Sequence, residues 1–275
     1  MRVQGFVFNW PGKKQHAATL EKLFKQHCET TVINSDDGLR LRHPHWQHIG
    51  NDAYFTDQWK AALDRFDADV FVHIQADVWP EKVGLVVAEA VRYIRYFGVG
   101  VYAPNVNFNA HVYNRNTLAK LDKGVYEVPA TDCCFWAIAG EVIRNTPRVD
   151  SRTNKLGWGI EYMVGAVAWQ RGLRLVRDYR FTAGHPKFSG YGHEQALREW
   201  AELKNSLDPA LKAEMELVEK ERESLIVKNV SRNPLDRVVK GVRNRASRLS
   251  GDTAAAANGP VAVGASFWRR IYPLK

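Results

Sequence analysis

Apolar and polar residues alternate along the first 180 positions in blocks that predict strands and helices in turn. Short runs rich in Val, Phe and Ile, each stopped by turn-forming residues, predict buried strands. Between them, apolar residues recur every three or four positions among Lys, Glu and Ala, which is typical of amphipathic helices. The predicted strands are 3–9, 31–34, 70–74, 99–103, 133–139 and 173–176, and the predicted helices are 15–27, 56–66, 81–96 and 160–171.

This alternation predicts an α/β fold with a mainly parallel, Rossmann-like sheet that is covered by helices on both faces. In such sheets ligands gather at the carboxyl ends of the strands. Four polar residues fall at predicted strand ends, namely Asn9, Asp36, Asp37 and Asp77. We therefore expect a binding site at this edge of the sheet.

The chain after residue 192 has a different character. A loop at 183–192 is expected to close the body, and from 194 to 228 Glu, Lys, Leu and Ala dominate, which predicts charged helices broken near Asp208 and Pro209. We divide the chain into a catalytic domain at 1–192, a charged helical extension at 193–227 and a basic C-terminal segment at 228–275.

The positive charge is concentrated in the last segment. The chain has 275 residues, 45% of them hydrophobic, and a formal net charge of +9, but 228–275 alone carry ten Lys or Arg against two Asp. The rest of the chain is nearly neutral and large enough for one substantial core. The basic composition is thus no indication that the folded body binds nucleic acid.

The cysteines and the lengths of the apolar runs indicate where in the cell the protein is expected. Cys28, Cys133 and Cys134 are odd in number and lack a CxxC spacing, so we interpret them as reduced and structural. No run approaches the ~18 apolar residues of a spanning helix, and the first eleven residues are too short and polar for a secretory signal. We expect a cytoplasmic protein that neither spans a membrane nor is exported.

Asp77 is the sharpest candidate for a site residue. A carboxylate that directly follows a buried strand points to the ligand-binding edge, where its oxygens can hold a divalent metal. The alternative is a structural aspartate that caps a turn or helix ahead of Pro80.

A second candidate is the run Gly157-Trp158-Gly159-Ile160-Glu161. The glycines allow close backbone approach, Trp158 offers a flat apolar face to a sugar or base, and Glu161 can act as a general base. A glutamate in a first helical turn is also favoured by the helix dipole. Further on, His185 in a polar loop could ligate a metal through a neutral imidazole, although a lone surface histidine is usually inert.

The order of these pieces resembles the glycosyltransferases of GT-A fold, in particular family-2-like enzymes that use nucleotide-sugar donors. The resemblance covers about residues 1–192. It is carried by 5–9, Asp36-Asp37, Gln75-Ala76-Asp77 in the place of the Asp-x-Asp motif, Thr131-Asp132, 157–161 and His185-Pro186.

The resemblance implies a role for each of these positions. Asn9, Asp36, Asp37, Gln75 and Asp77 would bind the donor, with Asp36 or Asp37 on the base or ribose. Asp77 and His185 would hold a divalent Mn²⁺ or Mg²⁺ that bridges the diphosphate. Glu161 would deprotonate the acceptor hydroxyl in an inverting displacement, while Asp132 and Trp158 would contact the acceptor.

Gln75 departs from the family pattern, because a neutral amide replaces the first aspartate of Asp-x-Asp. We expect weaker metal binding, with greater dependence on Asp77, His185 and the phosphates. Three other functions stay open: a glycoside hydrolase with Asp132 and Glu161 as its carboxylate pair, a transferase that acts on nucleic acid, and a non-catalytic nucleotide- or glycan-binding protein.

The basic segment predicts a membrane contact. At 235–249 six apolar residues fall on one helical face and basic residues cover the rest, which is typical of a helix on an anionic membrane. A small-residue linker at 251–266 leads to an aromatic and basic cluster at 267–272. The alternatives are a helix packed on the body and a nucleic-acid-binding tail. We expect a transferase on the cytoplasmic face of a membrane, with a lipid-linked or cell-surface glycan as acceptor.

Overall fold

The computed structural model describes residues 1–40, 42–107, 117–186 and 192–232, with side chains up to 225. Met1–Arg222 form one compact unit, and the described part of the second unit, Glu223–Lys275, is the end of helix α7. The helices are α1 (Lys14–Phe24), α2 (Phe55–Arg65), α3 (Val83–Tyr96), α4 (Gly140–Asn145), α5 (Ile160–Gln170), α6 (His193–Ser206) and α7 (Pro209–Arg232), with a 3₁₀ turn at Asp37–Leu39. The strands are β1 (Val3–Asn9), β2 (Glu29–Asn34), β3 (Gln47–His48), β4 (Val70–Gln75), β5 (Trp79–Pro80), β6 (Val99–Val106), β7 (Ala119–Asp122), β8 (Val125–Glu127), β9 (Phe135–Ala139) and β10 (Arg174–Gly184).

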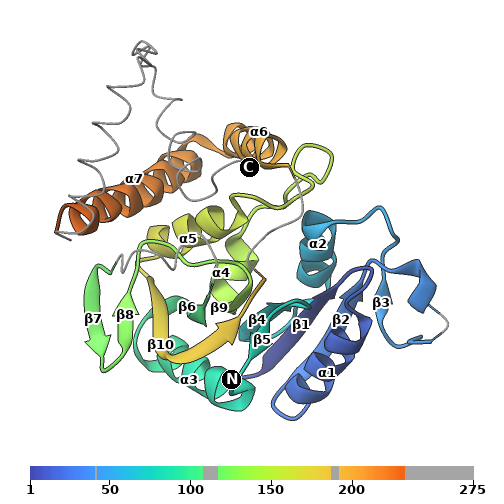
Figure 1. Ribbon diagram of the computed structural model, residues 1–275. Helices are drawn as coiled ribbons and strands as arrows, with labels where there is room; N and C mark the ends of the chain where they lie inside the picture. The colour runs from blue at the N-terminus through green and yellow to red at the C-terminus, as the bar shows by residue number, and fades with distance from the viewer. Residues whose placement is uncertain (41, 108–116, 187–191, 233–275) are drawn as a thin grey trace, which may run out of the picture. The chain divides into compact units, whose positions relative to one another are not determined.

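All these strands join one sheet in the order β3-β2-β1-β4-β9-β6-β10-β8-β7, with β5 paired to β10 (Figure 1). Strands β3, β2, β1 and β4 run parallel, as do β6 and β10. Strand β9 lies between β4 and β6 and runs antiparallel to both. The predicted α/β fold is confirmed, and its sheet, which was expected to be mainly parallel, is mixed.

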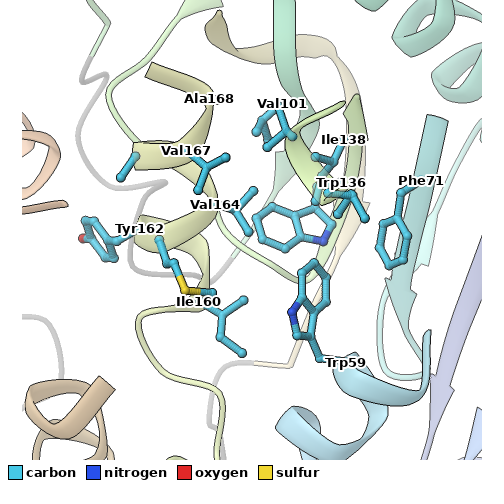
Figure 2. Packing of buried hydrophobic residues seen from close by; sticks show 14 of the residues in the cluster. Trp59, Phe71, Val101, Trp136, Ile138, Ile160, Tyr162, Val164, Val167 and Ala168 are labelled. Atoms are coloured by element: carbon cyan, nitrogen blue, oxygen red, sulfur yellow. The ribbon is translucent and has the colours of Figure 1, made fainter. Parts of the chain in front are cut away.

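Two hydrophobic cores cover the two faces of the sheet. One face packs against α1 and α3 through residues such as Leu20, Phe24 and Val86. The other face packs against α2, α4 and α5, where Trp59 and Trp136 meet with ring centroids 5.7 Å apart. Figure 2 shows these two indoles between Phe71 of the sheet and the α5 side chains. Burial of these large side chains on both faces fixes the sheet between its helices.

The direction of β9 decides which residues reach the carboxyl edge of the sheet. Phe135 is paired with Ile74 near the end of β4, and Ala139 with Val70 at its beginning. The chain therefore enters β9 at the edge where β1 and β4 end, and the backbone carbonyl of Cys134 accepts from the Gln75 amide. The segment before β9, which includes Asp132, is placed at the candidate site for this reason.

The last strand is much longer than its apolar pattern predicts. We expected a strand at 173–176, and β10 runs on to Gly184 through Arg177, Asp178 and Arg180. Its register with β6 shifts between Asp178 and Thr182, and its end pairs with β5. The expected loop consequently begins at His185 rather than at 183.

The C-terminal predictions are described only in part. The break near Asp208 is confirmed, since α6 ends at Ser206 and α7 begins at Pro209. The boundaries at 192 and 227 stay predictions, and the amphipathic helix, linker and aromatic cluster predicted at 235–272 lie outside the described residues. Among the helices that the structure describes, none is long and apolar enough to cross a bilayer.

Candidate active site

The ends of β1 and β2 are joined by side-chain amides. Asn9 is fully buried and its Nδ2 donates to Asn34 Oδ1 at 2.5 Å, while Asn34 Nδ2 contacts His48 Nδ1 at 2.8 Å. Asn9 Oδ1 has no hydrogen-bond partner among the described residues. Asn9 thus ties two strand ends together and retains an acceptor at this edge.

The two aspartates after β2 shape the turn that follows it. Asp36 Oδ1 accepts from the Gly38 amide at 3.0 Å and caps the 3₁₀ turn. Asp37 exchanges two bonds with Asn51, since its amide donates to Asn51 Oδ1 at 2.7 Å and its Oδ2 accepts from the Asn51 amide at 3.2 Å. Both residues lie after a strand end, as predicted, and their carboxylates bind backbone amides of the surrounding loop.

Asp77 and His185 come together from elements that are far apart in the sequence. Asp77 follows β4, His185 follows β10, and Asp77 Oδ1 lies 3.9 Å from His185 Nε2. The antiparallel pairing of Trp79 with Gly184 holds the two segments side by side, and the His185 amide donates to Asn107 Oδ1 at 2.8 Å. The structure therefore forms the predicted pair.

This pair carries polar atoms that the described residues leave unsatisfied. Asp77 Oδ1 and His185 Nδ1 are buried, and neither has a hydrogen-bond partner among the described residues. Burial raises the pKa of Asp77, while the charges of His185, Lys13 and His16 oppose that rise. Such atoms are costly unless a ligand satisfies them.

The pair fits a divalent metal as two ligands of a larger set. Carboxylate oxygen and imidazole nitrogen bind such ions at about 2.1 Å, so two atoms up to about 4.2 Å apart can share one ion. In the described part of the chain no group of three or more His, Cys, Asp or Glu could hold a metal. Asp77 and His185 would hold the ion together with oxygens from outside the protein, as Mg²⁺ is often held by one or two carboxylates and substrate phosphates.

Gln75 contributes its backbone to this edge. Its amide donates to the Cys134 carbonyl, and its own carbonyl accepts from Val78 in the turn that presents Asp77. The side chain of Gln75 is partly buried. Its predicted role in donor binding stays a prediction.

The Gly157–Glu161 segment is held by close packing. Gly157 and Gly159 have φ values of +78° and +92°, and a Cβ on Gly157 would lie 2.2 Å from Phe55 Cδ1. A Cβ on Gly159 would lie 2.5 Å from Trp200 Cδ1. Only glycine fits either position, because both the backbone conformation and the neighbouring rings exclude a side chain.

Side chains from outside the segment fix its course. Asn154 Nδ2 donates to the Trp158 carbonyl at 2.8 Å, and Glu199 Oε2 of α6 accepts from the Leu156 amide at 2.7 Å. The Trp158 ring lies edge-on to His193 at 5.5 Å between centroids. Trp158 as a whole residue is partly exposed.

Glu161 lies in the first turn of α5, in an environment suited to a general base. Burial raises the pKa of Glu161 to about 7, and the charge of Asp132 adds to the rise. The backbone amides of Glu161 and Gly159 and the guanidinium of Arg222 oppose it. A pKa near the working pH is what general-base catalysis requires.

Asp132 links the two halves of the site through its charge. It is 4% exposed, its Oδ1 accepts from the Cys134 amide at 3.1 Å, and Arg177 Nη2 lies 3.8 Å from its Oδ2. Burial raises its pKa, and the charges of Arg177 and His185 oppose the rise. Because the charge of His185 lowers the pKa of Asp132 and the charge of Asp132 raises that of Glu161, the Asp77–His185 pair and Glu161 belong to one polar cluster.

Sequence reasoning missed four residues of this cluster. Arg177 is buried in a strand segment that carried no apolar signal, and Arg222 comes from α7, in the charged extension. His16 contacts the Ala76 carbonyl at 2.6 Å and stacks on the half-exposed Trp79, and Asn107 binds the His185 amide. Arg177 could have been proposed as a site residue because it is a basic residue near the end of a predicted strand. Nothing in the sequence indicated the other three.

Comparison with known proteins identifies the fold. No protein-family model and no curated protein matches the sequence. Among solved structures, GalNAc-T7 with UDP, GalNAc and Mn²⁺ superposes with a TM-score of 0.57 at 13% identity, over 86% of this chain and 58% of that protein. TarS of S. aureus (residues 1–349) with UDP-GlcNAc superposes with a TM-score of 0.53 at 12% identity, over 99% of this chain and 82% of that chain.

A third similar structure is glucosyl-3-phosphoglycerate synthase from Mycobacterium tuberculosis with Mn²⁺, UDP and phosphoglyceric acid. Its TM-score is 0.50 at 11% identity, and the match covers 78% of each chain. The likeness extends over most of this chain in all three cases, and the chain spans little more than half of GalNAc-T7. The protein therefore has the GT-A fold of nucleotide-sugar glycosyltransferases.

Proposed function

We propose that this protein is a glycosyltransferase that moves a sugar from a nucleotide-sugar donor to an acceptor hydroxyl. The observation that carries the proposal is the approach of Asp77 to His185 after β4 and β10, together with the charge effects that link Asp132 to His185 and to Glu161. Four segments far apart in sequence supply these groups. The GT-A fold supports the same function, since the three similar structures hold UDP or a UDP-sugar.

The donor side of the proposed site lies over β1, β2 and β4. Asn9, Asp36 and Asp37 would contact the nucleoside, and Asp77 with His185 would hold the metal and, through it, the diphosphate. A bound Mn²⁺ or Mg²⁺ would supply charge stabilisation for the departing nucleoside diphosphate. Because GalNAc-T7, TarS and the mycobacterial synthase carry UDP species, UDP-sugars are the first donors to test.

The acceptor side lies at the start of α5. Glu161 would accept the proton of the attacking hydroxyl, and the exposed part of Trp158 would contact the acceptor. One base at this position supports an inverting displacement. The burial of Asp132 beside Arg177 argues against its use with Glu161 as a hydrolase pair, and equally against its predicted contact with the acceptor, because a buried, ion-paired carboxylate is poorly placed to meet a substrate.

The acceptor class and the location rest on sequence alone. The basic helix predicted at 235–249 and the aromatic cluster at 267–272 support binding to an anionic membrane surface, and hence a lipid-linked or cell-surface glycan as acceptor. We propose that the protein works at the cytoplasmic face. A nucleic-acid acceptor would instead give steeply salt-dependent binding to DNA and none to anionic vesicles.

The reaction is tested by nucleotide release from UDP-sugars with Mn²⁺, in wild type and Glu161→Gln. We expect Glu161→Gln to bind the donor as wild type does and to lose about 10²- to 10⁴-fold in transfer rate to an added glycan acceptor. Glu141→Gln, the same change at a half-exposed carboxylate that pairs with Arg171, is the matched control and should keep full activity. Equal transfer rates for wild type and Glu161→Gln would show that Glu161 is not the base. If wild type binds the donor but transfers no sugar, the result would favour a non-catalytic binding protein, which agrees with Gln75 in place of the first aspartate of Asp-x-Asp.

A further inference from the structure

The turn that presents Asp77 lies beside the first turn of helix α1. Residues 10–13 are all that separates the end of β1 from the start of α1. Strand β1 pairs in parallel with β4, and the Ala76 amide, just past the end of β4, donates to the Phe8 carbonyl at 2.9 Å. Helix α1 therefore begins next to the segment that follows β4.

His16, in the first turn of α1, binds the peptide unit that leads into Asp77. Its Nδ1 lies 2.6 Å from the carbonyl oxygen of Ala76. Because a carbonyl oxygen can only accept a hydrogen bond, Nδ1 carries the proton and donates it. The Ala76 carbonyl and the Asp77 amide belong to one rigid peptide plane, which also contains the Asp77 Cα. The hydrogen bond from His16 therefore holds the plane to which the Asp77 side chain is attached.

The ring of His16 is itself held by Trp79. The two rings stack with centroids 5.1 Å apart and an interplanar angle of 23°. Trp79 pairs with Gly184 across β5 and β10, and its indole lies against Gly184, where a Cβ would be 3.6 Å from Trp79 Cε3. Gly184 directly precedes His185. His16 thus binds the Asp77 segment and, through Trp79, contacts the strand pair that brings His185 beside Asp77.

The metal pair depends on such support because it offers few ligands. Asp77 and His185 supply two ligand atoms, and Gln75 has a neutral amide where the family pattern has a carboxylate. With few protein ligands, the affinity for the ion depends on how firmly each ligand is held in its productive direction. Asp77 Oδ1 has no hydrogen-bond partner among the described residues. The backbone of the turn therefore has a large part in setting the direction of this carboxylate.

We propose that His16 is a positioning residue of the metal site, which directs the Asp77 carboxylate toward the ion by holding the Ala76–Asp77 peptide plane. This inference rests on the proposed function, since the metal pair belongs to the donor site proposed above. His16 is not assigned as a ligand, because the described residues include no group of three or more His, Cys, Asp or Glu that could hold a metal. Groups that orient metal ligands without touching the ion are typically worth about 10- to 100-fold in metal affinity.

The test separates the hydrogen bond of His16 from its ring stack. His16→Phe keeps a ring against Trp79 and removes the donor, whereas His16→Asn keeps a side-chain N–H donor and removes the ring. Binding of Mn²⁺ to the full chain, alone and with UDP, is measured from the loss of the EPR signal of the free ion. We expect His16→Phe to bind Mn²⁺ about tenfold more weakly than wild type, and His16→Asn to stay within about threefold of wild type.

A matched control removes a different histidine that also contacts α1. His45 Nε2 lies 3.1 Å from Glu21 Oε1 of α1, and no printed contact joins His45 to the Asp77 turn, so His45→Phe should bind Mn²⁺ alone as wild type does. If His16→Phe does not fold, His16→Leu, which also lacks the donor, takes its place. Wild-type Mn²⁺ affinity in the variant without the donor, or an equal loss in His16→Asn, would overturn the proposal.

The kinetics of transfer from a UDP-sugar give a second readout. Because the role of His16 is confined to metal binding, the Mn²⁺ concentration for half-maximal rate should rise about tenfold in His16→Phe. The rate at saturating Mn²⁺ should stay within about threefold of wild type. A loss of rate that saturating Mn²⁺ does not restore would contradict a role through the metal site.

The outcomes separate this inference from the proposed function. If wild type binds Mn²⁺ but transfers no sugar, and His16→Phe binds the ion more weakly, the proposed function fails and the role of His16 stands. If wild type transfers sugar and His16→Phe binds Mn²⁺ equally well, the proposed function stands and the role of His16 is overturned. Absence of Mn²⁺ binding by wild type, alone and with UDP, also overturns it, because there would be no metal site to position.

Discussion

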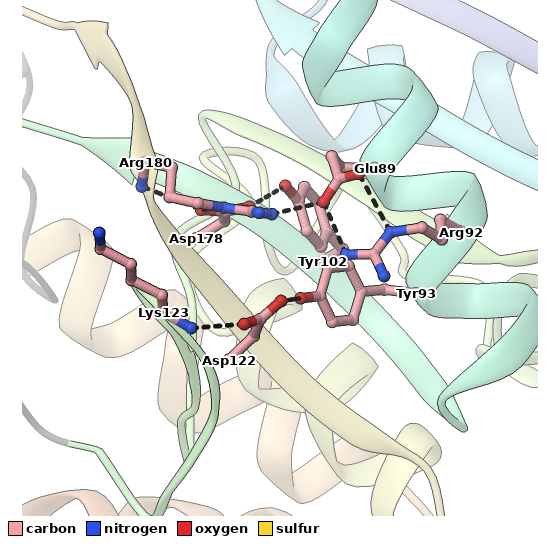
Figure 3. Close-up of polar contacts among 8 residues, drawn as sticks. All are labelled: Glu89, Arg92, Tyr93, Tyr102, Asp122, Lys123, Asp178 and Arg180. Atoms are coloured by element: carbon pink, nitrogen blue, oxygen red, sulfur yellow. Dashed lines mark hydrogen bonds and ion pairs between the residues drawn. The ribbon is translucent and has the colours of Figure 1, made fainter.

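Asp178, inside strand β10, and Asp77, in the turn after β4, are two carboxylates with opposite surroundings. Asp178 is fully buried, and it accepts from Tyr102 Oη at 2.6 Å and from Arg180 through the backbone amide and the guanidinium (Figure 3). Asp77 has a buried Oδ1 without a hydrogen-bond partner among the described residues, and its ion-pair contact is with His185 at 3.9 Å.

The network around Asp178 is saturated. Arg180 also pairs with Glu89 of α3, Glu89 binds Arg92 at 2.9 Å, and Tyr93 Oη donates to Asp122 Oδ2 at 3.3 Å. The pKa of Glu89 is accordingly lowered by Arg92 and Arg180, against the effect of burial. A saturated network joins β10, β6, α3 and β7, whereas an unsaturated pair at the strand ends retains capacity for a ligand.

The largest effect on stability is expected from Asp178→Asn. It removes the charge that Tyr102 and Arg180 bind, so the free energy of unfolding should fall by about 2–4 kcal/mol. Urea unfolding at pH 7 measures it, and UDP affinity of the folded variant should not change. Arg152→Ala, which breaks an exposed pair with Asp150, should cost no more than about 0.5 kcal/mol. A cost for Asp178→Asn as small as that would show that the network is not structural.

A smaller effect is expected from Glu161 as the pH changes. Folding raises its pKa from an ordinary 4.5 to about 7, so between these values the native state binds more protons than the unfolded state. Its contribution to stability is therefore full below pH 4.5 and is lost as the pH rises through 7. The stability of wild type relative to Glu161→Gln should fall by about 2 kcal/mol from about pH 5 to about pH 8. Parallel pH curves for the two proteins would mean that Glu161 has an ordinary pKa.

The smallest effect is expected from Asp77→Asn. Because Asp77 Oδ1 makes no hydrogen bond within the described residues and burial disfavours its charge, the change should alter the free energy of unfolding by less than about 1 kcal/mol. Thermal and urea unfolding at pH 7, beside Asp178→Asn, make the comparison directly. A cost as large as that of Asp178→Asn would assign Asp77 a structural role.

The sequence predicted the elements that follow simple periodicity. β1 matches its predicted bounds, and α3 and α5 begin and end within two residues of theirs. The strand predicted at 173–176 ends too early because Arg177, Asp178 and Arg180 interrupt the apolar pattern of β10. The residues that compensate these charges come from other parts of the fold. The hairpin of β7 and β8 was missed for a similar reason, since its short strands are mostly not buried.

The site was predictable where a residue directly follows a strand or opens a helix. Asp77 and His185 could be proposed from position, although their 3.9 Å approach depends on the pairing of Trp79 with Gly184, two segments about a hundred residues apart. Asp132 reaches the carboxyl edge because β9 is antiparallel, which a mainly parallel sheet would not predict. The sequence could not predict that Arg222 is buried, because it resembles the other charged residues of α7 in the sequence pattern and differs from them in its burial.

The central claim, that a nucleotide binds at Asp77, is tested most directly by ligand-induced stabilisation. The melting temperature of wild type, Asp77→Ala and Glu161→Gln would be measured with UDP, GDP, CMP and dTDP, each with and without Mn²⁺ or Mg²⁺, because a ligand that binds the native state raises it. We predict that one nucleotide with metal raises the melting temperature of wild type and Glu161→Gln but not of Asp77→Ala. No rise with any nucleotide in folded wild type, or an equal rise in Asp77→Ala, would contradict a donor site at this edge of the sheet.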